Sequence, residues 1–353
     1  MNLTICIAII NFYFICALSF DCISENGTTV DWWYIYKTPD VLYSAKGDQQ
    51  NYNSGLEYFY ADSFNPNLYK VSYRLLNSQH SAFGRTVNQY FEHSDKQSFG
   101  YFFYNDEHVN RSLNWKWGHS KGFGFFDSDG GIFVPHSVPK FPPTLDTFQY
   151  PENAKMFAQN LFCISLELED FEDLGKAFLY THPYFYDALN IPESLRSKLP
   201  SLDLAFQGSV DTEEPYYNIQ TSFTRLQRLP FTVFAKSSKF GMDIVADLMA
   251  PNLKSRLISE TWEHSDKTLA PFCSGEYHVD MVTKINISEN TVFYNSNDHS
   301  KWAVTDDVYF CSGDINRVET QFKRGGLYLC IGQKSLNDHV KSFISAYDGC
   351  SNN

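Results

Sequence analysis

Short apolar and aromatic runs alternate with polar turn residues along most of this chain. Eight of these runs are rich in Phe, Tyr, Trp, Val and Ile and are bounded by Asn, Asp, Gly or Pro, a pattern typical of β-strands. Several are apolar at consecutive positions, which indicates strands covered on both faces. The predicted strands are residues 32–37, 69–76, 98–105, 122–127, 131–138, 161–168, 230–237 and 278–287.

Helical spacing of apolar residues is found in fewer segments. Residues 240–257 have it before Pro251, and residues 335–350 have it near the C-terminus. Because strands and helices are mixed without regular alternation, we predict an α/β fold of the mixed α+β kind. In the C-terminal segment, one helix face would carry Leu336, Val340, Phe343, Ile344 and Tyr347.

The length of the chain favours two domains or one large unit with two lobes. Its 353 residues, 43% of them hydrophobic, can bury a sizeable core. The weakest internal boundary lies around residues 183–203, which are rich in loop-forming residues. We therefore expect an N-terminal lobe at 20–190 and a C-terminal lobe at 191–353, joined in one continuous unit.

The first 19 residues form an apolar run that ends in Ala17-Leu18-Ser19. Small residues at positions 17 and 19 fit a signal-peptidase site, so residues 1–19 are predicted to be a cleaved secretory signal. The alternative is an uncleaved anchor, but the run is short for a membrane span. We expect a mature protein that begins near Phe20, enters the secretory pathway and is not held in a membrane.

Cysteine usage agrees with an oxidising compartment. Removal of the signal leaves an even number of cysteines, which predicts three structural disulfides. No cysteine forms a Cys-x-x-Cys motif or pairs with histidine at zinc spacing, so no metal site is expected. Sequons predict glycosylation at Asn26, Asn110 and Asn286. The six cysteines are Cys22, Cys163, Cys273, Cys311, Cys330 and Cys350.

The chain is acidic, with a formal net charge of −13 and a pI near 5.2. This charge disfavours a broad basic surface for nucleic acid at neutral pH. At acidic pH the ten histidines become cationic and some carboxylates become neutral, so the net charge moves toward zero. We therefore expect a polyanion to bind well only in an acidic compartment.

Three His-x-Lys patterns occur, at 119–121, 299–301 and 339–341, against about one expected by chance from ten histidines and at most 28 lysines. On a strand, residues i and i+2 share a face, so this pattern directs an imidazole and an ammonium into one space. On a helix the two side chains diverge. The third pattern lies in the predicted C-terminal helix and is interpreted as a solvated face. The first two, both His-Ser-Lys, lead into strand-like segments in opposite halves of the chain.

Further polar residues follow the second His-Ser-Lys at regular spacing. Four residues separate Lys301 from Asp306, six more separate Asp306 from Gly313, and Asn316 is nearby. The first copy is looser, with Asp127 one position later than this spacing. Two such motifs in one chain resemble the phospholipase D superfamily, whose enzymes use two His-x-Lys motifs from pseudo-symmetric halves.

Longer stretches narrow the resemblance. From about residue 22 to Cys350, the chain resembles the deoxyribonuclease II family, and the His-Ser-Val-Pro stretch followed by Phe-Pro-Pro is the most specific part. The stretches that carry this resemblance are "VDWWYIYKTP" (30–39), "GRTVNQ" (84–89), "GHSKGFGFFDSDGGIFVPHSVPKFPP" (118–143), "SSKFGMDI" (237–244), "DHSKWAV" (298–304) and "CSGDINR" (311–317).

The resemblance implies a phospholipase D-like fold with two pseudo-symmetric lobes, each with a central mixed β-sheet flanked by helices. It also implies endonucleolytic cleavage of double-stranded DNA to 3′-phosphate and 5′-hydroxyl ends at acidic pH. No cofactor and no divalent cation are expected. Because the sequence has no helix-turn-helix or zinc-finger pattern, we expect little base specificity.

The candidate catalytic residues are His119, Lys121, His299 and Lys301. Two imidazoles and two ammonium groups can supply a nucleophile, an acid and positive charge for phosphodiester cleavage without a metal. The residues alone do not decide which histidine attacks. Analogy with the family favours His119 as the nucleophile and His299 as the acid.

Three further residues are candidates for supporting roles. His136 lies in the His-Ser-Val-Pro stretch and would border the site, or it is a core histidine at the end of a strand. Asp306 and Asn316 would orient Lys301 or His299, or they belong to turns.

The resemblance also implies the disulfides Cys22–Cys163, Cys273–Cys350 and Cys311–Cys330. The last would brace the segment after His299. A lysosomal or extracellular location is expected, and a homodimer is one assembly that the resemblance allows. Two other functions remain open. One is a phospholipase or other phosphodiesterase, which the stretches outside the His-Ser-Lys motifs disfavour. The other is a catalytically inactive secreted relative that acts as a binding or immune-interaction protein.

Overall fold

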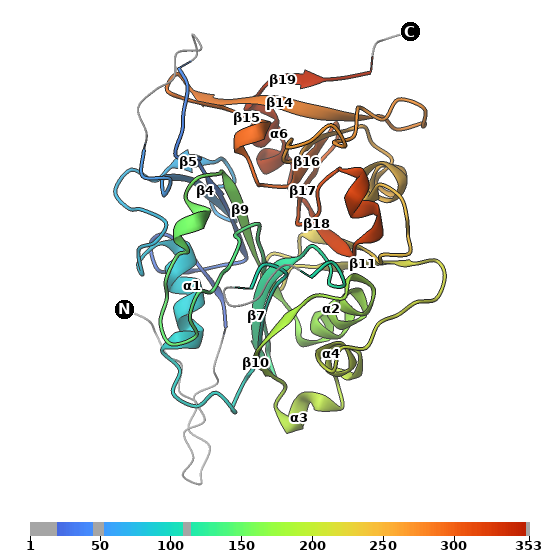
Figure 1. The fold of residues 1–353 in the computed structure, drawn as a ribbon. Coiled ribbons are helices and arrows are strands. Elements are labelled where there is room, and N and C mark those ends of the chain that lie inside the picture. Colours follow the sequence, from blue (N-terminus) through green and yellow to red (C-terminus); the bar gives the residue numbers. More distant parts are fainter. Residues whose placement is uncertain (1–19, 45–52, 109–113, 351–353) are drawn as a thin grey trace.

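The computed structural model describes residues 20–44, 53–108 and 114–350 (Figure 1). The predicted signal segment at 1–19 and the sequon at Asn110 lie outside these ranges. Two large β-sheets form the centre of the molecule, and helices cover them. The predicted mixed α/β class is therefore confirmed. Within the described ranges, no helix is both long enough and apolar enough to span a bilayer.

The first sheet has eight strands from the N-terminal half, and its strand pairs are all antiparallel. The mixed pairing expected in both lobes is therefore wrong for this sheet. Short turns join neighbouring strands such as β7 and β8, and such turns connect only antiparallel strands. Across the sheet the order is β10 (Phe185–Asn190), β6 (Gly100–Asn105), β7 (Lys121–Asp127), β8 (Gly130–Pro135), β9 (Gln159–Leu166), β3 (Trp32–Lys37), β4 (Tyr58–Asp62) and β5 (Tyr69–Lys70).

The second sheet has nine strands from the C-terminal half and is mixed, because β13 and β14 pair in parallel. A separate short ribbon joins β1 (Cys22–Ile23) and β2 (Thr29–Val30). The order in the second sheet is β11 (Tyr217–Phe223), β12 (Pro230–Lys236), β18 (Gly326–Gly332), β17 (Tyr309–Gly313), β16 (Trp302–Thr305), β13 (Leu257–Glu260), β14 (Val279–Ser288) and β15 (Thr291–Tyr294), with β19 (Ile344–Asp348) also paired to β14.

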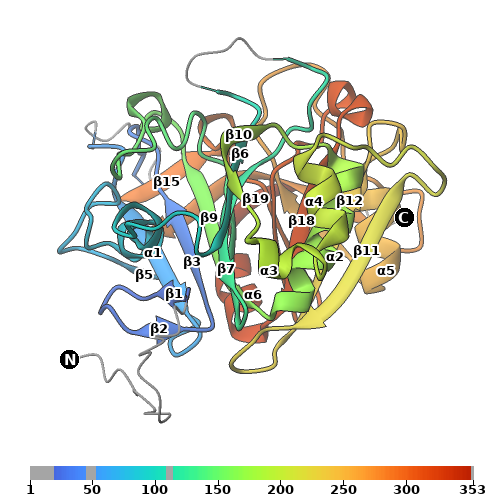
Figure 2. The same cartoon turned by 90° about the horizontal axis from the view of Figure 1, so that it is seen from below.

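Helices lie on the outer faces of the sheets and between their ends. The α2 helix packs on α4 and on β11 and β12, as Figure 2 shows. The helices are α1 (Ala82–Phe91), α2 (Leu168–Thr181), α3 (Glu193–Arg196), α4 (Pro200–Phe206), α5 (Ala250–Leu253) and α6 (Lys334–Ser342), with a π-helix at Ile244–Met249 and 3₁₀ turns η1 (Glu152–Ala154), η3 (Asn295–Asn297) and η4 (Glu319–Lys323).

Aromatic side chains hold the two sheets against each other. Alternate residues of β3 face opposite sides, as the pleat of a strand requires. Tyr34 meets Phe310 of β17, with ring centroids 4.7 Å apart. Trp33 points the other way and donates a hydrogen bond of 3.1 Å to Thr86 of α1. Both faces of β3 are therefore buried, which its continuous apolar sequence predicts.

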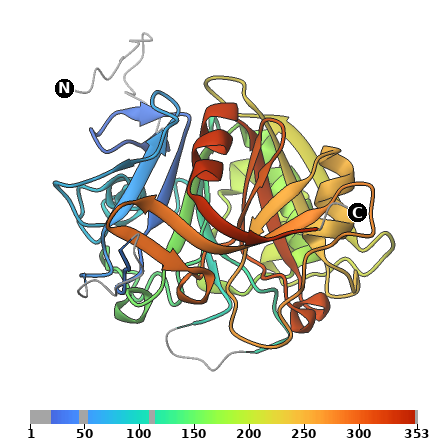
Figure 3. The same ribbon diagram turned by 90° about the horizontal axis from the view of Figure 1, so that it is seen from above.

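The C-terminal segment departs from the predicted helix. The α6 helix ends at Ser342, and residues 344–348 form β19, which pairs with β14. Cys350, bonded to Cys273, also donates its backbone N–H to Asp280 of β14 at 3.1 Å. Pairing with the sheet and this disulfide outweigh the helical spacing of Ile344 and Tyr347. Figure 3 shows β14 and β15, in orange, running across to the N-terminal strands, where Tyr43 pairs with Val292.

Two other predicted elements are shorter than expected. Within residues 240–257, the helical part is the π-helix followed by α5, and Pro251 lies in the first turn of α5, where its missing N–H costs nothing. Of residues 69–76, only the two residues of β5 are a strand. The expected boundary around 183–203 contains β10, α3 and the start of α4. Division of the chain at 190/191 stays a prediction.

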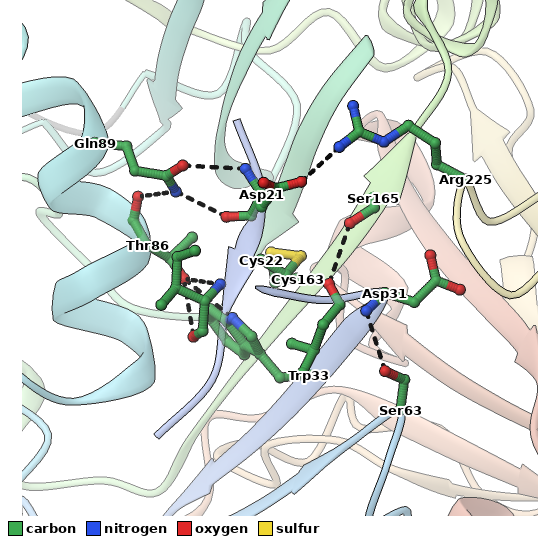
Figure 4. Close-up of a disulfide and its surroundings, with 12 residues drawn as sticks. Asp21, Cys22, Asp31, Trp33, Ser63, Thr86, Gln89, Cys163, Ser165 and Arg225 are labelled. Atoms are coloured by element: carbon green, nitrogen blue, oxygen red, sulfur yellow. Dashed lines mark hydrogen bonds and ion pairs between the residues drawn. A yellow bond between two sulfur atoms is a disulfide. The ribbon is translucent and has the colours of Figure 1, made fainter. Parts of the chain in front are cut away.

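The three disulfides have the pairing that the resemblance implies: Cys22–Cys163, Cys273–Cys350 and Cys311–Cys330. Figure 4 shows the first, which joins β1 to β9. Beside it, the Asp21 carboxylate lies 2.5 Å from Arg225, and the Asp21 backbone is bonded to Gln89 of α1. The N-terminal end of the described chain is therefore tied to both halves of the molecule.

Candidate active site

Each His-Ser-Lys tripeptide lies at the start of a strand of one sheet and is hydrogen-bonded to a residue next to a strand of the other. Lys121 is the first residue of β7, and the backbone N–H of His119 donates to Gly325, next to β18, at 2.9 Å. Lys301 lies directly before β16, and the backbone N–H of His299 donates to Ala158, next to β9, at 2.9 Å. Both tripeptides therefore lie between the two sheets.

The end of β17 connects the two tripeptides. The backbone N–H of Gly313 donates to the carbonyl of Lys301 at 2.8 Å. In the next residue, the carbonyl of Asp314 is hydrogen-bonded to Nδ1 of His119. Asn160 of β9 adds a second link, because it accepts from Lys301 N at 3.2 Å and donates to Ser312 Oγ at 2.6 Å. The structure thus brings the two predicted half-sites together.

The charges of the two tripeptides act on each other. Burial lowers the pKa of Lys301 to about 8, and Lys121 is the next cause. Burial also lowers the pKa of His299 to about 2, with Lys301 and Lys121 adding to the effect. For His119, burial and Lys121 hold the pKa well below its usual range. Without a bound anion, both imidazoles are therefore neutral.

The ammonium group of Lys121 is fixed by two ion pairs, of which the one with Asp106 is buried. It lies 2.6 Å from Asp106 and 3.2 Å from Glu107. The other oxygen of Asp106 lies 2.9 Å from Arg324, which also donates to the carbonyl of Trp117 at 2.9 Å. Such pairs hold a buried charge in place, because each cation has a charged partner.

The second tripeptide is surrounded by aromatic rings and acids. The His299 ring stacks on Phe157, with centroids 3.8 Å apart, and lies 4.0 Å from Trp262. Lys301 Nζ donates to the carbonyl of His299. Asp298 accepts a hydrogen bond from the hydroxyl of Tyr36 and another from Ser300 N at 2.7 Å. These contacts fix the backbone on both sides of His299.

The bond between His119 and Asp314 also sets the tautomer of the imidazole. A carbonyl oxygen can only accept a hydrogen bond, so Nδ1 of His119 carries the proton. In the neutral ring, Nε2 then has the free lone pair. This arrangement suits a nucleophile that attacks through Nε2.

His136 is linked to the site through the backbone. Its N–H donates to the carbonyl of Lys121 at 3.0 Å, and its Nδ1 accepts from Val138 N at 3.2 Å. Burial and Lys121 lower the pKa of His136 to about 3. Its ring packs near Phe141, with centroids 5.5 Å apart. It is a buried neutral histidine that supports the strand beginning at Lys121.

Asp306 and Asn316 contact residues other than Lys301 and His299, which they would orient in one of the two interpretations above. Asp306 follows the far end of β16, and its carboxylate pairs with Lys341 at 2.6 Å. Asn316 is buried and bonds to Thr261 at 3.2 Å and to Gln321 at 2.6 Å. Among the described residues, neither side chain is hydrogen-bonded to Lys301 or His299. These contacts agree with the alternative that Asp306 and Asn316 belong to turns.

Four acidic residues of the site were missed from the sequence. Glu260, at the end of β13, is fully buried, and neither of its carboxylate oxygens has a hydrogen-bond partner among the described residues. Burial, followed by Asp298, raises the pKa of Glu260 well above its usual value. Two of the four carried a signal, because Asp298 precedes the second His-Ser-Lys and Asp314 lies in the stretch 311–317 that resembles the family. The missed acids are Asp106, Glu260, Asp298 and Asp314.

One group of the described residues could offer ligands to a metal: Asp106, Glu107 and His119 have candidate atoms within 4.8 Å of one another. However, the oxygens of Asp106 are already bonded to Lys121 and Arg324. A divalent cation would lie beside these two buried cations and would be repelled. The arrangement favours an anion such as phosphate.

Two of the three predicted glycosylation sites lie in described segments. Asn26 is exposed in the turn between β1 and β2. Asn286 is half-buried in β14, where its backbone N–H donates to Phe343 at 2.8 Å. Asn26 is therefore the more accessible to a glycan, and modification at both sites stays a prediction.

Comparison with known proteins agrees with this geometry. The family model described as Deoxyribonuclease II matches residues 21–350. Plancitoxin-1 of Acanthaster planci is 32% identical over 93% of this chain and 92% of its own. Deoxyribonuclease-2-beta of Rattus norvegicus is 32% identical over 93% and 92%, and Deoxyribonuclease-2-alpha of Mus musculus is 31% identical over 95% and 94%. The mixed α/β architecture agrees with the phospholipase D-like fold of this family. The chain belongs to the deoxyribonuclease II family.

Proposed function

We propose that this protein is an acid endodeoxyribonuclease that cleaves double-stranded DNA to 3′-phosphate and 5′-hydroxyl ends without a metal. One observation carries the proposal: two His-Lys pairs, one from each half of the chain, are connected by the Gly313-Asp314 segment. A phosphate between them would meet two imidazoles and two ammonium groups, which are the groups that phosphodiester cleavage needs.

In the first step, Nε2 of His119 attacks phosphorus. The new N–P bond forms while the bond from phosphorus to the 5′-oxygen breaks, and His299 gives its proton to that leaving oxygen. The bond from Asp314 to Nδ1 holds the His119 ring in the required tautomer. Lys121 and Lys301 neutralise the non-bridging oxygens throughout.

In the second step, water attacks the phosphohistidine. His299, now neutral, accepts a proton from that water, the N–P bond breaks, and the 3′-phosphate is released. Both histidines are then back in their starting states. The same residue serves as acid and then as base, as microscopic reversibility requires.

The requirement for acid follows from the charges. His299 must be protonated to act as the acid, but burial and the two lysines lower its pKa. A bound phosphodiester brings a negative charge that opposes the lysines and favours the imidazolium. Low pH therefore favours protonation of His299. It also reduces the repulsion between DNA and a chain of net charge −13.

The test is cleavage of plasmid DNA at about pH 5 in EDTA. We expect cleavage by the wild type, none by His119→Ala or His299→Ala, and wild-type cleavage by His339→Ala, whose histidine belongs to the third His-x-Lys pattern. Product ends should resist extension by a polymerase until a phosphatase removes the 3′-phosphate. A need for Mg²⁺ or Ca²⁺, or cleavage by both variants, would refute the mechanism.

The alternative is a binding protein without catalysis. The coverage of His299 by Phe157 and Trp262 favours it, since a covered imidazole reaches substrate only if these rings leave room. Binding of DNA with no cleavage at any acidic pH would support this function. We further propose double-stranded DNA as the partner, a lysosomal or extracellular location, and a homodimer as the assembly to be tested.

A further inference from the structure

The described residues form a groove of about 610 Å³ that lies outside the residues assigned above to the active site. One wall is η4 and the other is formed by segments far apart in the sequence. Two lysines, one acid and two aromatic rings give it a mixed character. Its lining residues are Trp115, Gly241, Lys267, Glu319, Thr320, Phe322 and Lys323.

On one side the backbone connects the groove to His119. The chain passes from Lys323 to Arg324 and then to Gly325, whose carbonyl accepts the backbone N–H of His119. The guanidinium of Arg324 lies 5.1 Å from the centre of the Trp115 ring. The same guanidinium of Arg324 forms an ion pair with Asp106 of the candidate site. The indole ring is 60% exposed, so its outer face is free for contact.

On the other side a chain segment connects the groove to the ring that packs on His299. Lys267 lies in the segment that begins at Trp262, whose ring is 4.0 Å from that of His299. This segment is tied to η4, because Glu319 N donates to the carbonyl of Lys267 at 3.2 Å. The walls of the groove are therefore continuous with the segments that contact His119 and His299, and the bond from Glu319 to Lys267 joins the two walls.

The lining has the chemistry of a nucleic-acid strand site. Lys267 and Lys323 are exposed cations, while Trp115 offers a flat ring for stacking, a combination that proteins use on single strands. Glu319 opposes the lysines, and Glu263, His264 and Asp266 are exposed on the segment before Lys267. The lining alone, with two lysines and one acid, has a net charge of +1, which the neighbouring acids offset.

We propose that this groove binds the DNA strand next to the cleaved phosphate, with Lys267 and Lys323 at flanking phosphates and the Trp115 ring against a nucleoside. The proposal rests on the proposed function, because it extends the same site along the substrate. It predicts that long DNA gains binding energy from the groove, whereas a single-nucleotide ester does not reach it.

The test compares long duplex DNA with thymidine 3′-(p-nitrophenyl phosphate) at about pH 5. Trp115→Ala should lower kcat/KM on DNA relative to that on the ester, by less than the roughly 5- to 150-fold that base–aromatic stacking contributes on single strands, because the bases of a duplex are already stacked. The double variant Lys267→Ala/Lys323→Ala should reduce the slope of log KM against the logarithm of the salt concentration by about two, because each phosphate contact contributes about one to that slope. Glu319→Gln should change the ratio in the opposite direction and favour DNA. Tyr73→Ala, also 60% exposed, and Lys198→Ala are controls that should leave the ratio unchanged.

An unchanged ratio and an unchanged salt slope in the tryptophan and lysine variants would overturn the proposal, even if the wild type cleaves DNA normally. If Trp115→Ala does not fold, the lysine pair and Glu319→Gln decide by the same ratio. If the wild type cleaves neither substrate, the proposed function fails, and fluorescence anisotropy with labelled duplex tests the groove by itself. Weaker duplex binding by Trp115→Ala and the lysine pair would then uphold the groove, and equal binding would overturn it.

Discussion

Nδ1 of His119 is hydrogen-bonded to the backbone carbonyl of Asp314, a residue 195 positions further along the chain. This contact joins a loop of the first sheet to the end of β17 in the second. It also fixes the proton on Nδ1 and leaves the Nε2 lone pair free. A single bond between distant segments thus assembles the site and prepares one histidine to attack.

The pH dependence of kcat should differ from that of kcat/KM. Burial, Lys301 and Lys121 lower the pKa of His299 to about 2 in the free protein, so kcat/KM should fall about tenfold per pH unit between about pH 4 and 7. A bound phosphodiester raises that pKa, and kcat should therefore begin to fall at higher pH. Lys301→Met should lower the rate and move the kcat/KM decline to higher pH, since one cation is gone. Identical profiles for kcat and kcat/KM would contradict this account.

Asp106→Asn should destabilise the protein by about 3–5 kcal/mol, because it leaves the buried charges of Lys121 and Arg324 without their shared partner. Burial alone would raise the pKa of Asp106, but Lys121, His119 and Arg324 bring it well below its usual range. Its contribution is therefore present above about pH 4 and is lost only as pH falls further. Urea unfolding at pH 5 measures the loss. Asp306→Asn breaks a half-exposed pair and should cost no more than about 1 kcal/mol.

Loss of the Cys311–Cys330 disulfide should reduce activity as well as stability. The two cysteines face each other on β17 and β18, and β17 continues into the Gly313-Asp314 segment that contacts both tripeptides. Removing a bridge across 19 residues costs about 3 kcal/mol in the chain-entropy model. The double substitution to serine should lower kcat at temperatures where circular dichroism still reports a folded protein. Full activity of a reduced, folded sample would rule out the bracing role.

Glu260→Gln should stabilise the protein increasingly as pH rises. Burial and Asp298 raise the pKa of Glu260 well above its usual value of 4.5 in the folded state. As pH rises, the unfolded chain therefore loses this proton before the folded protein does. The stability of the wild type falls between the pKa of Glu260 in the unfolded chain and its pKa in the folded protein. The variant lacks that penalty, so its advantage in the free energy of unfolding should be larger at pH 7 than at pH 5. Glu263→Gln, at an exposed position, is the control; an advantage independent of pH would contradict the assignment.

The sequence predicts those parts of the fold that depend on local pattern. Aromatic and β-branched runs identify β3, β6, β7, β8, β9, β12 and β14, because such residues dominate strands that are largely buried. The α1 helix was missed, since Gly84 and Thr86 are weak helix formers and its stability comes from packing and from the Ser81 cap. The strand at 344–348 was missed for a similar reason, because tertiary pairing with β14 decides its conformation.

The candidate site divides in the same way. The two His-Ser-Lys tripeptides can be recognised in the sequence because the same motif occurs twice. Asn160 and Glu260 cannot be recognised in this way, since nothing in the local sequence shows that an asparagine in one strand bonds to Lys301 in the other half of the chain. Asp306 fits the motif spacing yet pairs with Lys341, because it lies at the opposite end of β16 from Lys301.

The most direct test of the central claim is the release of p-nitrophenolate from thymidine 3′-(p-nitrophenyl phosphate) by His299→Ala. This leaving group needs no proton, so His119 should still form the phosphohistidine, whereas water should no longer be activated to hydrolyse it. After an alkaline quench, we expect a burst of about one p-nitrophenolate per active site in His299→Ala and none in His119→Ala. A burst in His119→Ala and none in His299→Ala would contradict the assigned roles.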